Sequence, residues 1–183
     1  GTFHGNGADV NINYPLMMIG AGQNKTFLTG YELCIGGTKE EGKKVVVQDM
    51  TSSRNYGRGL FARDGLSFLC KDMTFTQCGD FGVYAYNTKG RLINCVITQC
   101  GSCGIACGSN ALIELEGDQT KVDGNGTGGY SNHYGLKTFH TSSTIHLLFP
   151  LTKESVSTNN RNDQNYGCPS YGTPGTIETV DSF

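Results

Sequence analysis

The stretch Asp72-Met73-Thr74-Phe75-Thr76-Gln77-Cys78-Gly79 returns 22 residues later as Asn94-Cys95-Val96-Ile97-Thr98-Gln99-Cys100-Gly101. A related stretch, Asp49–Asn55, precedes the first copy by 23 residues. Gln119–Asn125 follows the second copy after 25 residues, and Ser155–Asn159 follows after a further 34. Self-similarity at a period of about 20–50 residues is typical of solenoid proteins, in which each repeat forms one unit of a stack.

A second short strand repeats in step with the first, and each copy begins with glycine. Its copies are Gly59-Leu60-Phe61-Ala62, Gly82-Val83-Tyr84-Ala85, Gly104-Ile105-Ala106-Cys107 and Gly135-Leu136-Lys137-Thr138. Because side chains alternate between the two faces of a strand, three stacked inward columns are expected. These columns are Met50, Met73, Cys95 and Thr120; Ser52, Phe75, Ile97, Val122 and Val156; and Leu60, Val83, Ile105 and Leu136.

The pattern predicts an all-β fold, a single-chain parallel β-helix that forms one domain over residues 1–183. We expect about six to seven coils with a period of 22–25 residues, the longer late spacings being insertions. Composition agrees, since Gly accounts for 27 residues and charged residues for only 16%. Many glycines and few charges favour short strands joined by tight turns.

Charge and hydropathy exclude two classes of partner. The formal net charge of −2 and the absence of a basic stripe argue against nucleic acid. No apolar run approaches the roughly 18 residues of a membrane span. The predicted partners are therefore a second copy of the chain or a polysaccharide.

One turn of the repeat predicts an asparagine ladder, a stack of inward amides that bond to each other and to the turn backbone. The residues at this turn are Asn55, Cys78, Cys100, Asn125 and Asn159. The two cysteines in the middle either fill the turn as small residues or form a Cys78–Cys100 disulfide, because stacked Cα atoms fall within the reach of one. Eight cysteines, an even number, favour an oxidising compartment and hence an extracellular or cell-surface location.

The N-terminal stretch adds a resemblance to a known family. Gly1–His4, Val10–Ile12, Pro15–Gly22 and Lys25–Gly30 resemble the first coil of right-handed parallel β-helix proteins. The chain is similar to the pectin-lyase-like superfamily and its carbohydrate-binding and sugar-hydrolase type β-helix module. The resemblance implies right-handed coils, and it leaves function open, because the fold hosts lyases, hydrolases, epimerases, adhesins and surface fibres.

Asp49 and Asp72 are the candidate catalytic residues, since they stack in one outward column with Asn94 and Gln119. Two adjacent carboxylates can bind Ca²⁺. They can also raise the pKa of one carboxyl group relative to the other, so that one serves as a general acid and the other as a general base. A solvated polar face explains the same column. The chain departs from the enzymes of the family, because it has neither the paired-Asp motif of polygalacturonases nor an Arg-containing lyase signature. We therefore expect no catalysis, no metal site and no cofactor beyond that Ca²⁺ alternative.

Phe61 and Tyr84 lie in another outward column, which Ala106 and Lys137 continue. Exposed stacked aromatics bind sugar rings or another subunit, and ordinary cross-strand packing is the alternative. Asn24-Lys25-Thr26 is a glycosylation sequon in an exposed turn, whereas the sequon at Asn125 lies within the predicted ladder.

Two functional hypotheses follow from these patterns. The first is a non-catalytic, extracellular structural or adhesive module. No capping helix is apparent at either end of the sequence, so we expect head-to-tail association into a fibre or excision from a longer solenoid. The alternative is a carbohydrate-binding module or carbohydrate-active enzyme, a polysaccharide lyase or glycoside hydrolase, that acts on an acidic polysaccharide.

Overall fold

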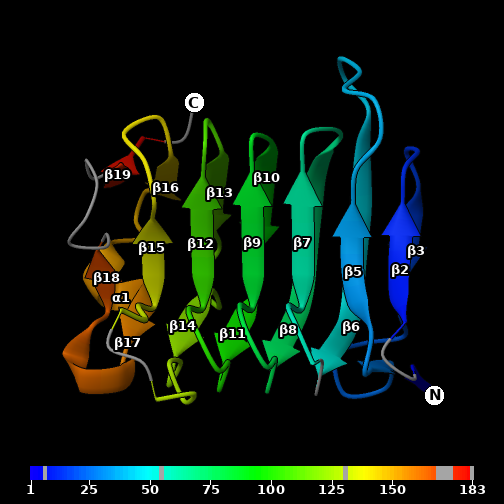
Figure 1. Ribbon diagram of the computed structural model, residues 1–183, viewed down its shortest axis with the longest axis horizontal. Coiled ribbons are helices and arrows are strands. Elements are labelled where there is room, and N and C mark those ends of the chain that lie inside the picture. The colour runs from blue at the N-terminus through cyan, green and yellow to red at the C-terminus, as the bar shows by residue number, and fades with distance from the viewer. Residues whose placement is uncertain (6–7, 54–55, 130–131, 168–174, 182–183) are drawn as a thin grey trace.

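The protein is a β-helix in which every strand pairs in parallel with the equivalent strand of the next coil (Figure 1). The computed structural model describes residues 1–5, 8–53, 56–129, 132–167 and 175–181. Helix is confined to α1 (Lys153–Val156) and the 3-10 turn η1 (Arg161–Asp163) within these ranges. No helix of the described chain has the length and apolarity to cross a membrane. The predicted all-β parallel β-helix is confirmed.

Each complete coil places one strand on each of three walls. The first wall is a seven-stranded sheet, named sheet B here. It contains β2 (Asp9–Ile12), β5 (Glu32–Ile35), β7 (Leu60–Arg63), β9 (Val83–Tyr86), β12 (Ile105–Gly108), β15 (Leu136–Thr138) and β18 (Tyr166–Gly167).

The other two walls are the two legs of one bent twelve-stranded sheet. Leg 1 contains β3 (Met17–Ile19), the first halves of β6 (Lys44–Ser53) and β8 (Ser67–Thr76), β10 (Lys89–Ile93), β13 (Leu112–Glu116), β16 (Thr144–Leu148) and β19 (Thr176–Val180). Leg 2 contains β1 (Thr2–His4), β4 (Phe27–Thr29), the second halves of β6 and β8, β11 (Val96–Thr98), β14 (Lys121–Asp123) and β17 (Ser157–Thr158).

The interior of the coils is a continuous stack of apolar side chains. Leu60, Val83, Ile105 and Leu136 are fully buried and pair in register, as the repeat predicts. One coil departs from the predicted register, because Val122 pairs with Ser157 rather than with Val156. Helix α1 ends at Val156 and inserts into the longest coil, so the strand begins one residue later than the repeat indicates.

The asparagine ladder is present at the C-terminal end of the turn column, with one residue corrected. Asn125 donates through Nδ2 to Oδ1 of Asn160 at 3.0 Å and accepts at Oδ1 from the amide of Cys100 at 3.1 Å. Asn159 is exposed and donates instead to Asp123. The prediction of Asn159 was wrong because the shifted register of the last coil places Asn160 inside. Asn55 lies outside the described residues.

Cys78 and Cys100 occupy the same slot as thiols, so the predicted Cys78–Cys100 disulfide is not formed. Each thiol donates to the carbonyl two residues upstream, Cys78 to Thr76 at 3.9 Å and Cys100 to Thr98 at 3.6 Å. The amide of Asn125 makes the equivalent bond to the carbonyl of Asp123 at 3.3 Å. The cysteines therefore take over one amide hydrogen bond of the ladder, which explains why they point to their own turns rather than to each other.

The bend between leg 1 and leg 2 uses left-handed backbone positions. Asp49, Asp72 and Asn94 have φ values of 59°, 49° and 51°, and Gly117 continues the column at 87°. Asp and Asn tolerate this region better than other non-glycine residues. The polar column that the repeat displays is thus explained by backbone conformation.

Close packing requires the glycine that immediately precedes each of β7, β9, β12 and β15. A Cβ atom on Gly82 would lie 2.3 Å from Cγ2 of Ile97, and one on Gly104 would lie 2.3 Å from Cγ1 of Val122. The inward side chains of leg 2 fill that space, so only glycine fits at these four positions.

Candidate functional site

The outer face of sheet B carries the outward aromatic residues Phe61 and Tyr84 that the sequence predicts. The strand register aligns an outward column of Asn11, Cys34, Phe61, Tyr84, Ala106 and Lys137. The next outward column includes Arg63 and Tyr86. Small residues, Ala106 and Gly108, follow on β12, and both are buried.

Phe61 and Tyr84 stack across neighbouring strands, with ring centroids 5.3 Å apart and an interplanar angle of 12°. The guanidinium of Arg58 lies 3.8 Å from the centroid of Phe61. Tyr84 also contacts Phe81 and Phe139, at centroid distances of 5.1 and 5.9 Å. Both predicted residues therefore lie on one surface, but their ring faces are largely covered by neighbours, which leaves mainly the edges for a ligand.

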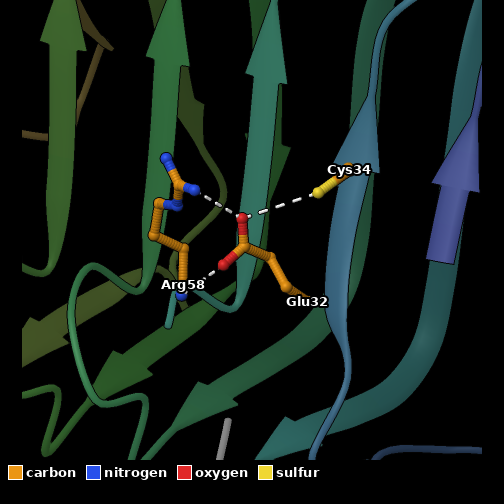
Figure 2. Close-up of polar contacts among 3 residues, drawn as sticks. All are labelled: Glu32, Cys34 and Arg58. Atoms are coloured by element: carbon orange, nitrogen blue, oxygen red, sulfur yellow. Dashed lines mark hydrogen bonds and ion pairs between the residues drawn. The ribbon is translucent and has the colours of Figure 1, made fainter. Parts of the chain in front are cut away.

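Glu32 on β5 is held by polar contacts with Arg58 and Cys34 (Figure 2). Its Oε1 accepts from the Arg58 guanidinium at 2.8 Å and from the Cys34 thiol at 3.5 Å. Its Oε2 accepts from the main-chain amide of Arg58 at 2.9 Å. Three donors from two segments thus fix the carboxylate, and the ion pair in turn holds Arg58 over the ring of Phe61.

The thiol and the phenol of this face are poor nucleophiles and bases. Burial, with the adjacent Glu32 carboxylate, raises the pKa of Cys34 to about 12. Burial, followed by the neighbouring Tyr86, also raises the pKa of Tyr84. Both groups therefore remain protonated near neutral pH, and the Cys34 thiol donates a hydrogen bond to Glu32.

A pocket of about 220 Å³ opens at the N-terminal part of the face, beside Phe61. Its polar lining comes from β2, β5 and β7 and the adjoining turns: Asp9, Asn11, Asn13, Glu32, Arg58 and Arg63. The pocket thus combines carboxylates, amides and guanidinium groups at one aromatic edge. Such a mixture of donors and acceptors suits a ligand rich in hydroxyl groups.

Asp49 and Asp72, the predicted catalytic pair, do not line this pocket. They lie at the bend between leg 1 and leg 2, where Asp49 accepts from Gln48 at 2.8 Å. Among the described residues, no group of three or more His, Cys, Asp or Glu side chains is placed to hold a metal. Asn24 is exposed in its turn, where a glycan attached to it would face solvent.

Sequence reasoning assigned none of the six polar lining residues of this pocket to a site. A signal for three of them exists in Asp9-Val10-Asn11-Ile12 and Glu32-Leu33-Cys34-Ile35, which alternate polar and apolar residues as the later repeats do. The repeat predicted from Asp49 onward does not include these first two strands of sheet B.

Comparison with known proteins supports the fold. The family model described as "Right handed beta helix region" matches residues 23–148. No curated protein matches the chain. Among solved structures, the A-module of mannuronan C-5 epimerase AlgE6 from Azotobacter vinelandii is similar, with 16% identity and a TM-score of 0.45. The match covers 100% of this chain and 56% of that one, so the chain spans little more than half of that protein. Since the family model covers most of its length, the chain belongs to the right-handed β-helix family.

Proposed function

We propose that this protein is a non-catalytic adhesive module that binds an acidic polysaccharide on the outer face of sheet B. The observation that carries the proposal is the polar pocket beside Phe61, in which carboxylate, amide and guanidinium groups converge. Polysaccharide hydroxyls both donate and accept hydrogen bonds, and this lining offers both kinds of partner.

Arg63 is the residue that favours an acidic sugar. Its side chain is exposed, with the guanidinium carbon 5.7 Å from the centroid of Phe61. Arg58 is committed to Glu32, whereas no carboxylate of the described chain lies within ion-pair distance of Arg63. A guanidinium recognises a carboxylate through two parallel hydrogen bonds, so Arg63 suits the carboxylate of a uronic acid.

The direction of the bound chain follows from the stacking of coils. Successive strands of sheet B lie about 4.8 Å apart along the helix axis. Phe61 and Tyr84 are neighbours along this axis, and the pocket begins at the N-terminal side of Phe61. We therefore place the polysaccharide along the axis, from the pocket across the edges of the two rings.

Binding without cleavage is supported by the hydrogen bonds and protonation states of the potentially reactive side chains beside the pocket. The Glu32 carboxylate is held by three donors, and Cys34 and Tyr84 remain protonated. An adhesive role of this kind fits an extracellular or cell-surface location, which is part of the proposal.

The test is affinity electrophoresis and calorimetry with polygalacturonate and alginate, with dextran as the neutral control polymer. We expect the acidic polymers to bind and Arg63→Gln to weaken binding about tenfold, equivalent to one lost charge-assisted contact. The matched control is Lys121→Gln, which removes an exposed cation from leg 2. Failure of both acidic polymers to bind, or equal losses in the two variants, would overturn the proposal.

Glycoside hydrolysis is the second candidate, favoured by one observation. Asp9 and Glu32 are direct partners in the register of β2 and β5, so two carboxylates stand on adjacent strands at the pocket. A pair of carboxylates is the usual machinery for cleaving glycosidic bonds. Reducing ends that appear with the unmodified protein and disappear in Asp9→Asn and Glu32→Gln would establish this function. Unsaturated products would indicate a lyase instead.

A further inference from the structure

Leg 1 presents a second outer face that the proposed function does not use. The strand register places its outward side chains in three columns across β3, β6, β8, β10, β13, β16 and β19. The middle column is Met17, Val46, Leu69, Arg91, Glu114, His146 and Glu178. We call this surface the leg 1 face.

The leg 1 face has an apolar component. Met17 and Ile19 at its N-terminal end are 62% and 59% exposed. A shallow groove of about 490 Å³ follows, with Leu69, Ile93 and Leu112 in its lining. Large apolar side chains that follow one another over several coils mark a surface suited to contact another macromolecule.

Charge is separated along the same face. Its basic residues lie on β6, β8 and β10, and its acidic residues lie on β13 and β19. They are Lys44, Lys71, Lys89 and Arg91 on one half and Glu114, Glu116 and Glu178 on the other. Arg91 pairs with Glu116 at 2.8 Å, whereas no carboxylate of the described chain lies within ion-pair distance of the three lysines.

We propose that the leg 1 face docks a second copy of this chain, face to face, with the two helix axes antiparallel. A twofold axis parallel to the strands, between β10 and β13, reverses the order of coils in the partner. The basic half of one copy then covers the acidic half of the other, with Lys89 and Arg91 over the strand that carries Glu114. A parallel arrangement would oppose like charges, which electrostatic complementarity disfavours.

The size of the face permits a weak, salt-sensitive dimer. With the axis between β10 and β13, the six strands from β6 to β19 overlap with the partner, and β3, which carries Met17 and Ile19, lies at the edge of the overlap. Six strands about 4.8 Å apart and about five residues wide give a flat face of roughly 500 Å². Two such faces bury about 1,000 Å², the lower end of specific interfaces. Because the paired charges are largely exposed, added salt must weaken the dimer.

This dimer differs from the head-to-tail stacking expected from the sequence, which would join the strand edges of the end coils. It is also independent of polysaccharide binding, because the pocket of sheet B and the leg 1 face share no residue. A dimer would present two binding faces for adhesion.

The experiment uses two opposite charge variants of the full chain. Lys44→Glu with Lys89→Glu makes the face acidic, and Glu114→Lys with Glu178→Lys makes it basic. We expect the unmodified protein to dimerise in sedimentation equilibrium at low salt, and each variant to self-associate at least tenfold more weakly. An equimolar mixture of the variants should form a one-to-one heterodimer.

The mixture separates docking from a folding defect, because two misfolded variants would not restore each other. Circular dichroism and retained polysaccharide binding check that each variant is folded and that the sheet B pocket is intact. An unmodified protein that stays monomeric up to millimolar concentration at low salt overturns the inference. Variants that dimerise as the unmodified protein does, or folded variants that do not combine, overturn it equally.

Discussion

The carboxylate of Glu32 holds Arg58 twice, at the guanidinium at 2.8 Å and at the main-chain amide at 2.9 Å. This double contact positions the guanidinium over Phe61 and places a negative charge beside Cys34. One residue therefore links the pocket, the aromatic stack and the ionisation of the thiol.

Removal of this charge should make Cys34 more reactive. Glu32→Gln removes one cause of the raised thiol pKa and releases Arg58, whose positive charge acts in the opposite direction. Each unit by which the pKa falls increases the thiolate fraction about tenfold at a fixed pH. We expect slow iodoacetamide labelling of native Cys34 at pH 8 and labelling faster by tenfold or more in Glu32→Gln. Mass spectrometry locates the label, and an equal rate in both proteins would contradict the electrostatic account.

The corrected ladder gives a prediction with adjacent residues as matched controls. Asn160 is buried, accepts from the amide and the side chain of Asn125, and donates to the carbonyl of Val122. Asn159 is exposed and bonds only to Asp123 among the described contacts. We expect Asn160→Ala to lower the free energy of unfolding by about 2–4 kcal/mol, because it leaves several buried groups unsatisfied, and Asn159→Ala by about 1 kcal/mol or less. Urea denaturation measures both, and equal losses would contradict the assignment.

The sequence predicts the stacked coils correctly but not the strand register of the last coil, and the difference has a physical reason. Columns such as Leu60 and Val83 repeat because each position packs on the same position of the next coil. The coil from Asn125 onward is longer and contains α1, whose capping by Thr152 has no counterpart in earlier coils. Spacing alone carries no information on how many residues such an insertion takes before the strand resumes.

Substitutions of Asp72 test whether this residue serves only to form the bend between leg 1 and leg 2. Its φ of 49° is unfavourable for a β-branched side chain and costs glycine little. We expect Asp72→Gly to be nearly neutral in unfolding free energy and Asp72→Val to be destabilised by about 1–2 kcal/mol. Neither change should alter polysaccharide binding, since Asp72 does not line the pocket. Loss of binding in the folded Asp72→Gly protein would return Asp72 to the candidate site.

The pocket was less predictable than the fold, because its residues come from different coils. Phe61 and Tyr84 were found as an outward column, which alternation predicts. That Arg58 covers the face of Phe61 depends on a turn conformation fixed by Glu32, and no periodicity encodes such a contact. Alternation predicts that the two rings point outward, and the structure shows that neighbouring side chains cover most of their faces.

The last coil should be sensitive to acid through Asp123. Its Oδ1 accepts from Thr158 at 2.7 Å and from Asn159 at 2.8 Å, and these bonds, Thr158 first, hold the pKa of Asp123 below its usual value. A lowered folded-state pKa stabilises the protein above the unfolded-state value of about 4, and this stabilisation is lost as the pH falls through the folded-state value. Asp123→Asn keeps the shape and removes the charge.

We therefore expect Asp123→Asn to be less stable than the unmodified protein by about 1 kcal/mol at pH 7, a modest value because the carboxylate is partly exposed. The difference should persist to about pH 5 and shrink below pH 4. Urea denaturation across pH 3–7 measures it, and Thr158→Val, alone and combined with Asp123→Asn, tests the coupling of the two side chains. A stability difference that stays constant from pH 7 to pH 3 would show that the charge of Asp123 does not stabilise the coil.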